Sequence, residues 1–191
     1  MKTTRLEAFS DGVIAIIITI MVLDMKGQHG EDLAALAPLL PVFLSYVLSF
    51  IYVGIYWNNH HHLFQSVENV NGAILWANLH LLFWLSLFPF VTGWMGENHF
   101  ATWPVALYGV VLMMAAVAYY VLIRALIAEH GRGSMIAKAI RNDYKGMVSI
   151  AVYALAVPLA FVNRWIGCAL YVVVALMWFI PDPRIEKKIK Q

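Results

Sequence analysis

The sequence has few charged residues and almost no cysteine. Only 13% of its 191 residues are Asp, Glu, Lys or Arg, about half of what a soluble domain uses to cover its surface. The single cysteine, Cys168, excludes an internal disulfide. A net charge of +2 is too small to indicate a nucleic-acid partner. These shortages argue against a soluble, a disulfide-stabilised or a nucleic-acid-binding protein.

Apolar residues dominate the chain instead, at 62%, and the mean hydropathy is +0.72. They fall into six long runs, which predict an all-α membrane protein of six transmembrane helices in the lipid bilayer. We expect one domain, 1–191, with spans at about 6–24, 38–59, 73–95, 102–128, 145–162 and 165–180.

Lysines and arginines are distributed unevenly between the two sides of these spans. If the N-terminus is cytoplasmic, all 13 of them except Lys26 and Arg164 lie on the cytoplasmic side. Cytoplasmic loops of membrane proteins carry such an excess. We therefore expect a multi-pass protein of the cell membrane with both termini in the cytoplasm.

The first apolar run is bounded by two acidic residues, Asp11 and Asp24. As a helix, the residues between them span roughly 18 Å, against about 30 Å for the hydrocarbon core of a bilayer. A charge inside a membrane helix is costly and usually faces the bundle interior or water. A signal peptide is disfavoured because Asp11 interrupts its expected junction. This favours a helix that lines an aqueous path, with both aspartates in wet vestibules.

An apolar stripe runs along the middle of this helix. Ile16, Ile20 and Leu23 are spaced i, i+4 and i+7 and so share one face. Thr19 lies beside the stripe, where its hydroxyl can bond to a carbonyl three or four residues earlier or to a neighbouring helix. Taken alone, such a stripe is typical of a helix-packing surface.

Polar residues of the first three spans are expected to meet at one depth. Buried polar groups require partners in a membrane. We expect Ser10 and Asp11 to bond to Asn or His side chains of the neighbouring helices, with Arg5 closing the network. The candidates on the second and third spans are Asn58, Asn59, His60, Asn78 and His80.

The adjacent histidines at 60–62 allow a different hypothesis, a metal site. Neighbouring residues on a helix point about 100° apart, so these three cannot bind one ion, and typical ligand pairs are spaced i, i+4. We assign them to hydrogen bonding and expect no metal, no cofactor and no enzymatic activity. A metal-dependent membrane enzyme is the less favoured alternative.

The start of the first span resembles a known family. Arg5, Phe9, Ser10 and Asp11 match R-x-x-x-F-S-D, the signature that opens the first helix of the transmembrane protein 175 potassium channels. The chain is similar over essentially its whole length to the prokaryotic members, which have a single six-helix unit. The resemblance implies a homotetramer whose central pore is lined by the first helix of each subunit.

The resemblance also implies how ions pass. The pore has no TVGYG filter, a motif absent from this sequence, and narrows on apolar side chains. Counted from the signature, the constriction falls on Ile16, with Ile20 and Leu23 further outward. Thr19 occupies a position near the selectivity region. The signature residues are expected to hold the first helix against its neighbours without touching ions.

We therefore expect a channel that passes potassium with moderate preference over sodium. Asp24 at the outer mouth would raise the local cation concentration. A secondary ion transporter is the alternative function. Against it, the first span has no midpoint broken by glycine or proline, and the chain shows no inverted repeat.

Overall fold

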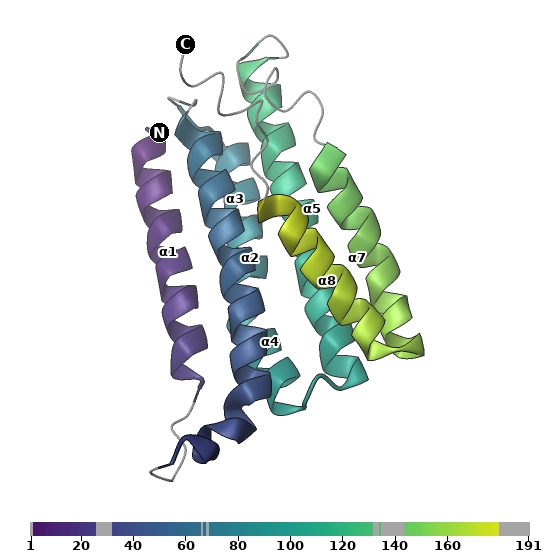
Figure 1. Ribbon diagram of the computed structural model, residues 1–191. Coiled ribbons are helices and arrows are strands. Elements are labelled where there is room, and N and C mark those ends of the chain that lie inside the picture. The colour runs from purple at the N-terminus through teal and green to yellow at the C-terminus, as the bar shows by residue number, and fades with distance from the viewer. Residues whose placement is uncertain are drawn as a thin grey trace.

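The protein is a bundle of helices in the computed structural model, which describes residues 2–25, 32–65, 67, 69–131, 134 and 144–179 (Figure 1). In chain order its elements are α1 (Thr3–Leu23), the 3-10 helix η1 (Leu33–Leu39), α2 (Leu40–Gln65), α3 (Gly72–Ser86), α4 (Phe88–Glu97), α5 (Thr102–His130), α7 (Tyr144–Val162) and α8 (Arg164–Phe179). Within these ranges the only β pairing is an isolated bridge between Lys2 and Asn69. That bridge ties the start of α1 to the segment before α3.

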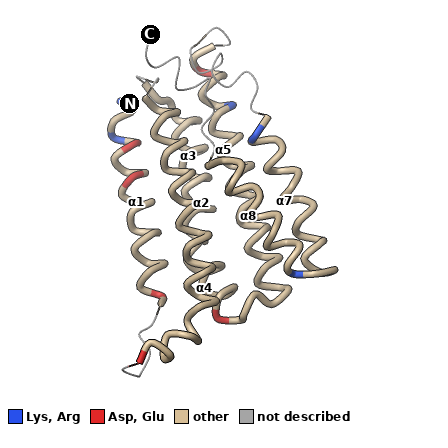
Figure 2. The backbone as a smooth tube through the Cα atoms, viewed as in Figure 1, with Lys and Arg blue, Asp and Glu red and all other residues tan. Residues whose placement is uncertain are grey.

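The composition of the helices suits a bilayer. Five described segments are long and apolar enough to cross a membrane, and α8 is a shorter apolar helix of 16 residues. Most charged residues lie toward the two ends of the helices, and the middle of the bundle is nearly free of them (Figure 2). The prediction of an all-α, multi-pass membrane protein is confirmed.

The third span is interrupted, which the sequence prediction of one helix over 73–95 missed. Leu87 separates α3 from α4. The cause is Pro89 in the first turn of α4, because proline has no backbone N–H and its ring clashes with the carbonyl four residues earlier in a continuous helix. The amide of Leu87 accordingly bonds to the carbonyl of Trp84, three residues earlier, at 3.3 Å.

The second span is longer than predicted. α2 runs to Gln65 instead of ending near 59, so the polar stretch from Trp57 to His62 is helical throughout. These side chains therefore point in different directions around one axis. This decides which of them can reach α1 and which cannot.

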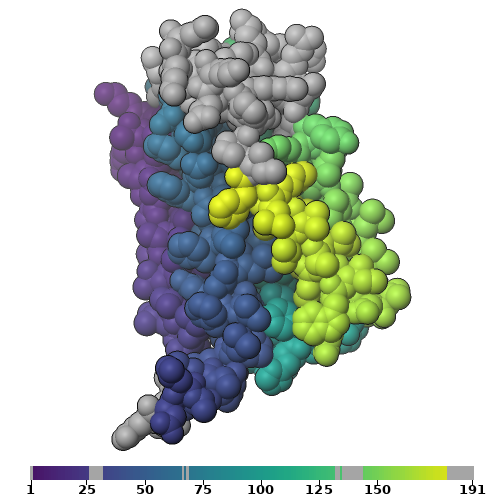
Figure 3. Space-filling model, viewed as in Figure 1, coloured from purple at the N-terminus to yellow at the C-terminus, as the bar shows by residue number. Residues whose placement is uncertain are grey.

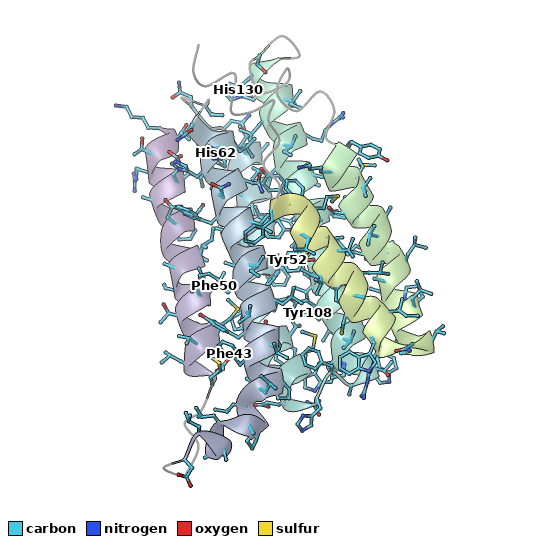
Figure 4. All side chains as sticks on the ribbon, viewed as in Figure 1. Phe43, Phe50, Tyr52, His62, Tyr108 and His130 are labelled. Carbon is cyan, nitrogen blue, oxygen red and sulfur yellow. The ribbon has the colours of Figure 1, made fainter. Side chains whose placement is uncertain are left out.

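Tyrosines fill the core where α2, α5, α7 and α8 meet. Tyr52, Tyr108 and Tyr171 are fully buried, and the ring centroids of Tyr108 and Tyr171 lie 5.7 Å apart. In Figure 4, Tyr52 and Tyr108 lie in the interior of the bundle. The hydroxyl of Tyr171 donates to the carbonyl of Val105 at 3.1 Å, so this buried polar group is satisfied.

By contrast, α1 lies at the edge of the bundle, where it packs against α2, α3 and α4 (Figures 1 and 3). It is 21 residues long, or roughly 32 Å, which matches the thickness of a bilayer core. The helix thus extends past Asp11 toward the N-terminus, and this residue lies in its third turn. The short distance between the two aspartates does not limit the length of the helix.

A candidate pore-lining helix and its polar anchor

One face of α1 is packed into the bundle. Its buried residues recur every three or four positions, as on one side of a helix: Thr3, Leu6, Ser10, Ile14, Ile17 and Met21. Because these side chains contact α2, α3 and α4, the rotation of α1 about its own axis is determined by the fold of a single chain.

The face of α1 turned away from the bundle carries the apolar stripe. Phe9 is 53% exposed, Ile16 59%, Ile20 42% and Leu23 71%. Large apolar side chains lined up on one helix face need a partner, which for a membrane protein is lipid or a second protein surface. If several copies turned this face toward a common axis, its residues would form stacked apolar rings, and a narrow apolar ring can close a pore by dewetting.

Thr19 is the hydroxyl residue beside this stripe, and it is exposed. Its Oγ1 donates to the carbonyl of Ala15 at 2.9 Å, which is the first of the two alternatives that the sequence left open. The hydroxyl oxygen keeps its capacity to accept a hydrogen bond. It therefore presents a polar edge at the level between Ile16 and Ile20.

Three buried side chains join α1, α3 and α2 in series. Ser10 Oγ donates to the carbonyl of Leu6 at 2.8 Å and accepts from Asn78 Nδ2 at 2.9 Å. Asn78 Oδ1 then lies 2.8 Å from His60 Nε2. All three residues are at most 1% exposed, so the cluster is removed from solvent. We call Ser10, Asn78 and His60 the anchor triad.

Hydrogen-bond chemistry sets the direction of each bond in the anchor triad. Since the Ser10 hydroxyl donates to a carbonyl, its oxygen must accept, and the amide nitrogen of Asn78 must face it. The amide oxygen of Asn78 then faces His60, so the proton of the imidazole is on Nε2. The other ring nitrogen, Nδ1, is buried and has no hydrogen-bond partner among the described residues.

Asp11 belongs to a second, more exposed contact at the same end of α1. Its Oδ1 accepts from the indole Nε1 of Trp57 on α2 at 3.0 Å. The Trp57 ring stacks on His61, with centroids 6.0 Å apart and planes 12° from parallel. His61 Nε2 is in turn 2.8 Å from the side-chain nitrogen of Gln65. The contact therefore joins α1 to α2 at the edge of the bundle.

The predicted network is therefore only partly assembled. Asn59 is bonded elsewhere, because its Nδ2 donates to the carbonyl of Ile55 on its own helix. His80 accepts from Trp84 Nε1 on α3 at 3.0 Å, since it lies two residues from Asn78 and so points to another side of that helix. Asn58 is exposed on the surface of α2.

Two expected contacts around Asp11 differ from the prediction. We expected an Asn or His partner for this carboxylate, with Arg5 closing the network. In the structure the carboxylate of Asp11 instead accepts a hydrogen bond from the indole of Trp57, and the side chain of Arg5 is exposed. The reason is the rotation of the two helices: Asp11 follows Ser10 by about 100° around α1 and so faces the outer side of α2, where Trp57 lies.

Sequence analysis missed a second set of buried hydroxyls, nearer the other end of α1. Ser49 Oγ lies 2.6 Å from Thr92 Oγ1 and 2.9 Å from the hydroxyl of Tyr108, so α2, α4 and α5 are joined. The Thr92 hydroxyl also lies 3.9 Å from the sulfur of Met21 on α1. The available signal was the pair of serines at 45 and 49, which share one face of an otherwise apolar helix.

Asp24 occupies the end of α1 opposite the anchor triad. It caps the C-terminus of the helix, its amide bonds to the carbonyl of Ile20 at 3.0 Å, and its side chain is exposed. Together with Leu23 it forms the far end of the exposed face. A cation that travelled along that face would meet this carboxylate at the end.

The chain is similar to proteins of known function along its whole length. The family model described as the endosomal/lysosomal potassium channel TMEM175 matches residues 5–89. The chain is 56% identical over 191 residues to a potassium channel of Chryseobacterium sp. (strain P1-3), with 100% of both chains covered. It is 30% identical over 190 residues to a potassium channel of Chamaesiphon minutus (strain ATCC 27169 / PCC 6605), with 92% of each covered.

A solved structure has the same fold. The crystal structure of a lysosomal potassium-selective channel TMEM175 homolog from Chamaesiphon minutus matches with a TM-score of 0.80 and 26% identity. The match covers 93% of this chain and 96% of that one. With its R-x-x-x-F-S-D signature, its six apolar segments and full-length relatives, the chain belongs to the TMEM175 family, a family of channels and not of enzymes, and is one of its prokaryotic members.

Proposed function

We propose that the protein is a potassium channel in which four copies surround a central pore and turn the exposed face of α1 toward it. The observation that supports this most is the exposure of Ile16. It lies in the middle of a helix whose other face is packed, yet its side chain is 59% exposed. A position of Ile16 on a shared pore would explain this exposure. The acidic residue at the end of α1 also suits a cation path, and the similar proteins are named potassium channels.

In this proposal Ile16 forms the narrowest ring of the pore. An apolar constriction excludes water until it widens, so the ring acts as gate as well as filter. Ile20 and Leu23 form wider apolar rings further out, and Asp24 concentrates cations at the mouth. Selection follows the cost of distorting the hydration shell, which is lower for potassium than for sodium. Without rigid carbonyl rings, the preference is moderate.

The anchor triad would serve this pore without touching ions. It holds the start of α1 against α2 and α3 and thereby determines which residues face the axis. The contact between Asp11 and Trp57 acts at the same end. Opening would then require the outer part of α1 to tilt while its start stays attached.

The proposal includes a cytoplasmic location for both termini in the cell membrane. Among the described residues, Arg124 lies near the end of α5 and Lys145 at the start of α7, whereas Arg164 begins α8. The end of α5 and the start of α7 lie at the end of the bundle where α1 begins, and α8 begins at the other end (Figure 1). Lys26, Arg132, Lys138, Arg141 and the basic residues of 184–190 also entered the prediction of orientation, and they lie outside the described residues. The positive-inside rule supports this orientation.

Flux through liposomes tests the proposal. The purified protein is reconstituted, and potassium efflux down a gradient is measured with sodium as the competing ion. Ile16→Asn should raise the flux and weaken the preference for potassium, because a polar ring holds water. The matched control is Leu155→Asn on α7, a residue that is 62% exposed and lies away from the proposed pore. Equal effects of both substitutions would exclude Ile16 as the constriction.

The same measurement separates a channel from a secondary transporter. The break at Leu87 is the feature that favours a transporter, since discontinuous helices are common in that class. A channel carries potassium without a second coupled ion. A fixed dependence of the potassium flux on a sodium or proton gradient would favour the transporter, and native mass spectrometry in mild detergent would show whether four copies assemble.

A further inference from the structure

A cavity of about 40 Å³ lies on the side of the bundle away from α1, among α2, α5, α7 and α8. Tyr56 and Asn59 line it from α2, Ala116 and Tyr120 from α5, and Trp178 from α8. These five are partly exposed, whereas Tyr52, Ser149 and Tyr153, which also line the cavity, are buried. The cavity lies in the half of the bundle that contains the start of α1. The end of α5 and the start of α7 lie in the same half.

The walls of this cavity suit hydrocarbon. Aromatic rings and aliphatic groups dominate the lining, and several polar groups already have partners within the protein. Trp178 Nε1 donates to Ser149 Oγ at 2.9 Å, and the hydroxyl of Tyr119 donates to the carbonyl of Asn59 at 3.2 Å. An apolar cavity of this kind holds water poorly. An alkyl chain that entered it would exchange lipid contacts for contacts with packed rings.

Two cationic side chains, Lys145 and Arg124, lie next to the cavity, and each is placed over an aromatic ring that lines it. Lys145 Nζ lies 6.0 Å from the ring centroid of Trp178, and Arg124 Cζ lies 5.9 Å from that of Tyr120. Arg124 lies in the second-to-last turn of α5 and Lys145 in the first turn of α7, toward the same end of the bundle. Lys and Arg near the membrane surface attract anionic lipids.

We propose that this cavity takes up part of an acyl chain of an anionic phospholipid, whose headgroup phosphate is attracted by Arg124 and Lys145. A neutral lipid would contact the apolar walls of the cavity but would not be attracted by the two cations. The C-terminal segment 181–191 is a poor occupant because it carries four basic and two acidic residues and would be repelled by the same cations. The inference does not depend on the pore, so it would survive if the proposed conduction path were wrong.

Lipid titration of the full-length protein tests this site. The protein in mild detergent is titrated with phosphatidylglycerol, phosphatidylcholine or oleate, and bound lipid is counted by native mass spectrometry. We expect the parent to prefer phosphatidylglycerol over phosphatidylcholine. Arg124→Gln and Lys145→Gln should each weaken phosphatidylglycerol binding roughly fivefold, the effect of one cation near a membrane surface. Arg124 is exposed, so its substitution leaves the packing intact.

Arg164→Gln is the matched control for charge. Arg164 also lies over an indole ring, 5.4 Å from the centroid of Trp165, but at the opposite end of the bundle. It should not alter phosphatidylglycerol binding. Equal losses in all three variants would mean that total charge, not this site, attracts the lipid, and the proposal would be wrong. The same conclusion follows if the parent binds both phospholipids equally.

Ala116→Phe tests whether the acyl chain enters the cavity. The added ring fills the space from α5, so phosphatidylglycerol binding should fall while the two cations remain. Ala154→Phe on the exposed side of α7, which does not line the cavity, is its control. Unchanged binding in folded Ala116→Phe protein would overturn the proposal. If oleate binds as tightly as phosphatidylglycerol, the site accepts any single-chain anion, and the proposal of a phospholipid site is wrong.

Discussion

Asn78 on α3 donates to Ser10 on α1 through a hydrogen bond of 2.9 Å that is buried inside the protein. The other end of the same amide bonds to His60 on α2, so one side chain holds three helices together. Ile16 lies about 120° around α1 from Ser10, because the two are six positions apart on a helix. When Ser10 is turned into the bundle, Ile16 is therefore turned out of it.

The anchor triad should contribute measurably to stability. Asn78→Ala removes both bonds of the amide and leaves a buried donor on His60 without its acceptor, so we expect a loss of about 1–3 kcal/mol. Ser10→Ala should cost less, about 0.6 kcal/mol, the average contribution of an interhelical hydrogen bond in a membrane. Thermal unfolding in detergent measures both. Ser86→Ala, on an exposed serine, is the control, and an equal loss there would contradict the assignment.

The contact between Asp11 and Trp57 should depend on an acceptor oxygen more than on charge. Asp11→Asn keeps an oxygen that can accept from the indole, whereas Asp11→Leu removes it. We expect Asp11→Asn to retain most of the potassium flux in liposomes and Asp11→Leu to change it strongly. Trp57→Phe, which lacks the donor, should resemble Asp11→Leu. If Asp11→Asn is as disruptive as Asp11→Leu, the charge itself is required.

The size of the side chain at 16 should control conduction. In the proposed pore, Ile16→Ala widens the narrowest ring and should raise potassium flux several-fold, and Ile16→Phe should nearly abolish it. Leu155→Ala and Leu155→Phe repeat the same changes on a comparably exposed residue of α7 and should leave flux close to that of the parent. If the flux does not depend on the size of the side chain at position 16, the gate is not formed by Ile16.

Gly109 should tolerate no side chain. A Cβ placed there would collide with the hydroxyl of Tyr171, which donates to the carbonyl of Val105. We expect Gly109→Ala to lower the free energy of unfolding by about 1–3 kcal/mol, the usual effect of overpacking a core. At Gly54 a Cβ would meet nothing within 4 Å, so Gly54→Ala should be neutral or stabilising by up to about 1 kcal/mol. The midpoint of thermal unfolding should therefore fall for Gly109→Ala and should not fall for Gly54→Ala.

Most of the fold could be predicted because a bilayer constrains sequences strongly. Long apolar runs leave a membrane helix as the main option, and the signature at Arg5, Phe9, Ser10 and Asp11 identified the family. The break at Leu87 was missed although Pro89 was visible. A proline near the middle of a span can kink a helix or end it, and which of the two occurs depends on how neighbouring helices accommodate the freed backbone groups.

The polar partners could be predicted by depth but not by direction. Asn78 and His80 lie at similar depths, and both were candidates for the same cluster. In the structure Asn78 donates a hydrogen bond to Ser10, whereas His80 accepts one from Trp84 on its own helix. Sequence spacing gives angles within one helix, whereas the rotation of one helix against another follows from the packing of both.

Sequence alone therefore determined that the chain crosses a membrane repeatedly, that α1 carries one apolar stripe with acidic ends, and which family it belongs to. These properties are local, because they depend on composition and on the 3.6-residue repeat of a helix. Tertiary structure decided that the stripe from Ile16 to Leu23 faces outward and that Asp11 is held by Trp57. Both depend on the rotation of α1 about its axis, which only its packing against α2, α3 and α4 can set.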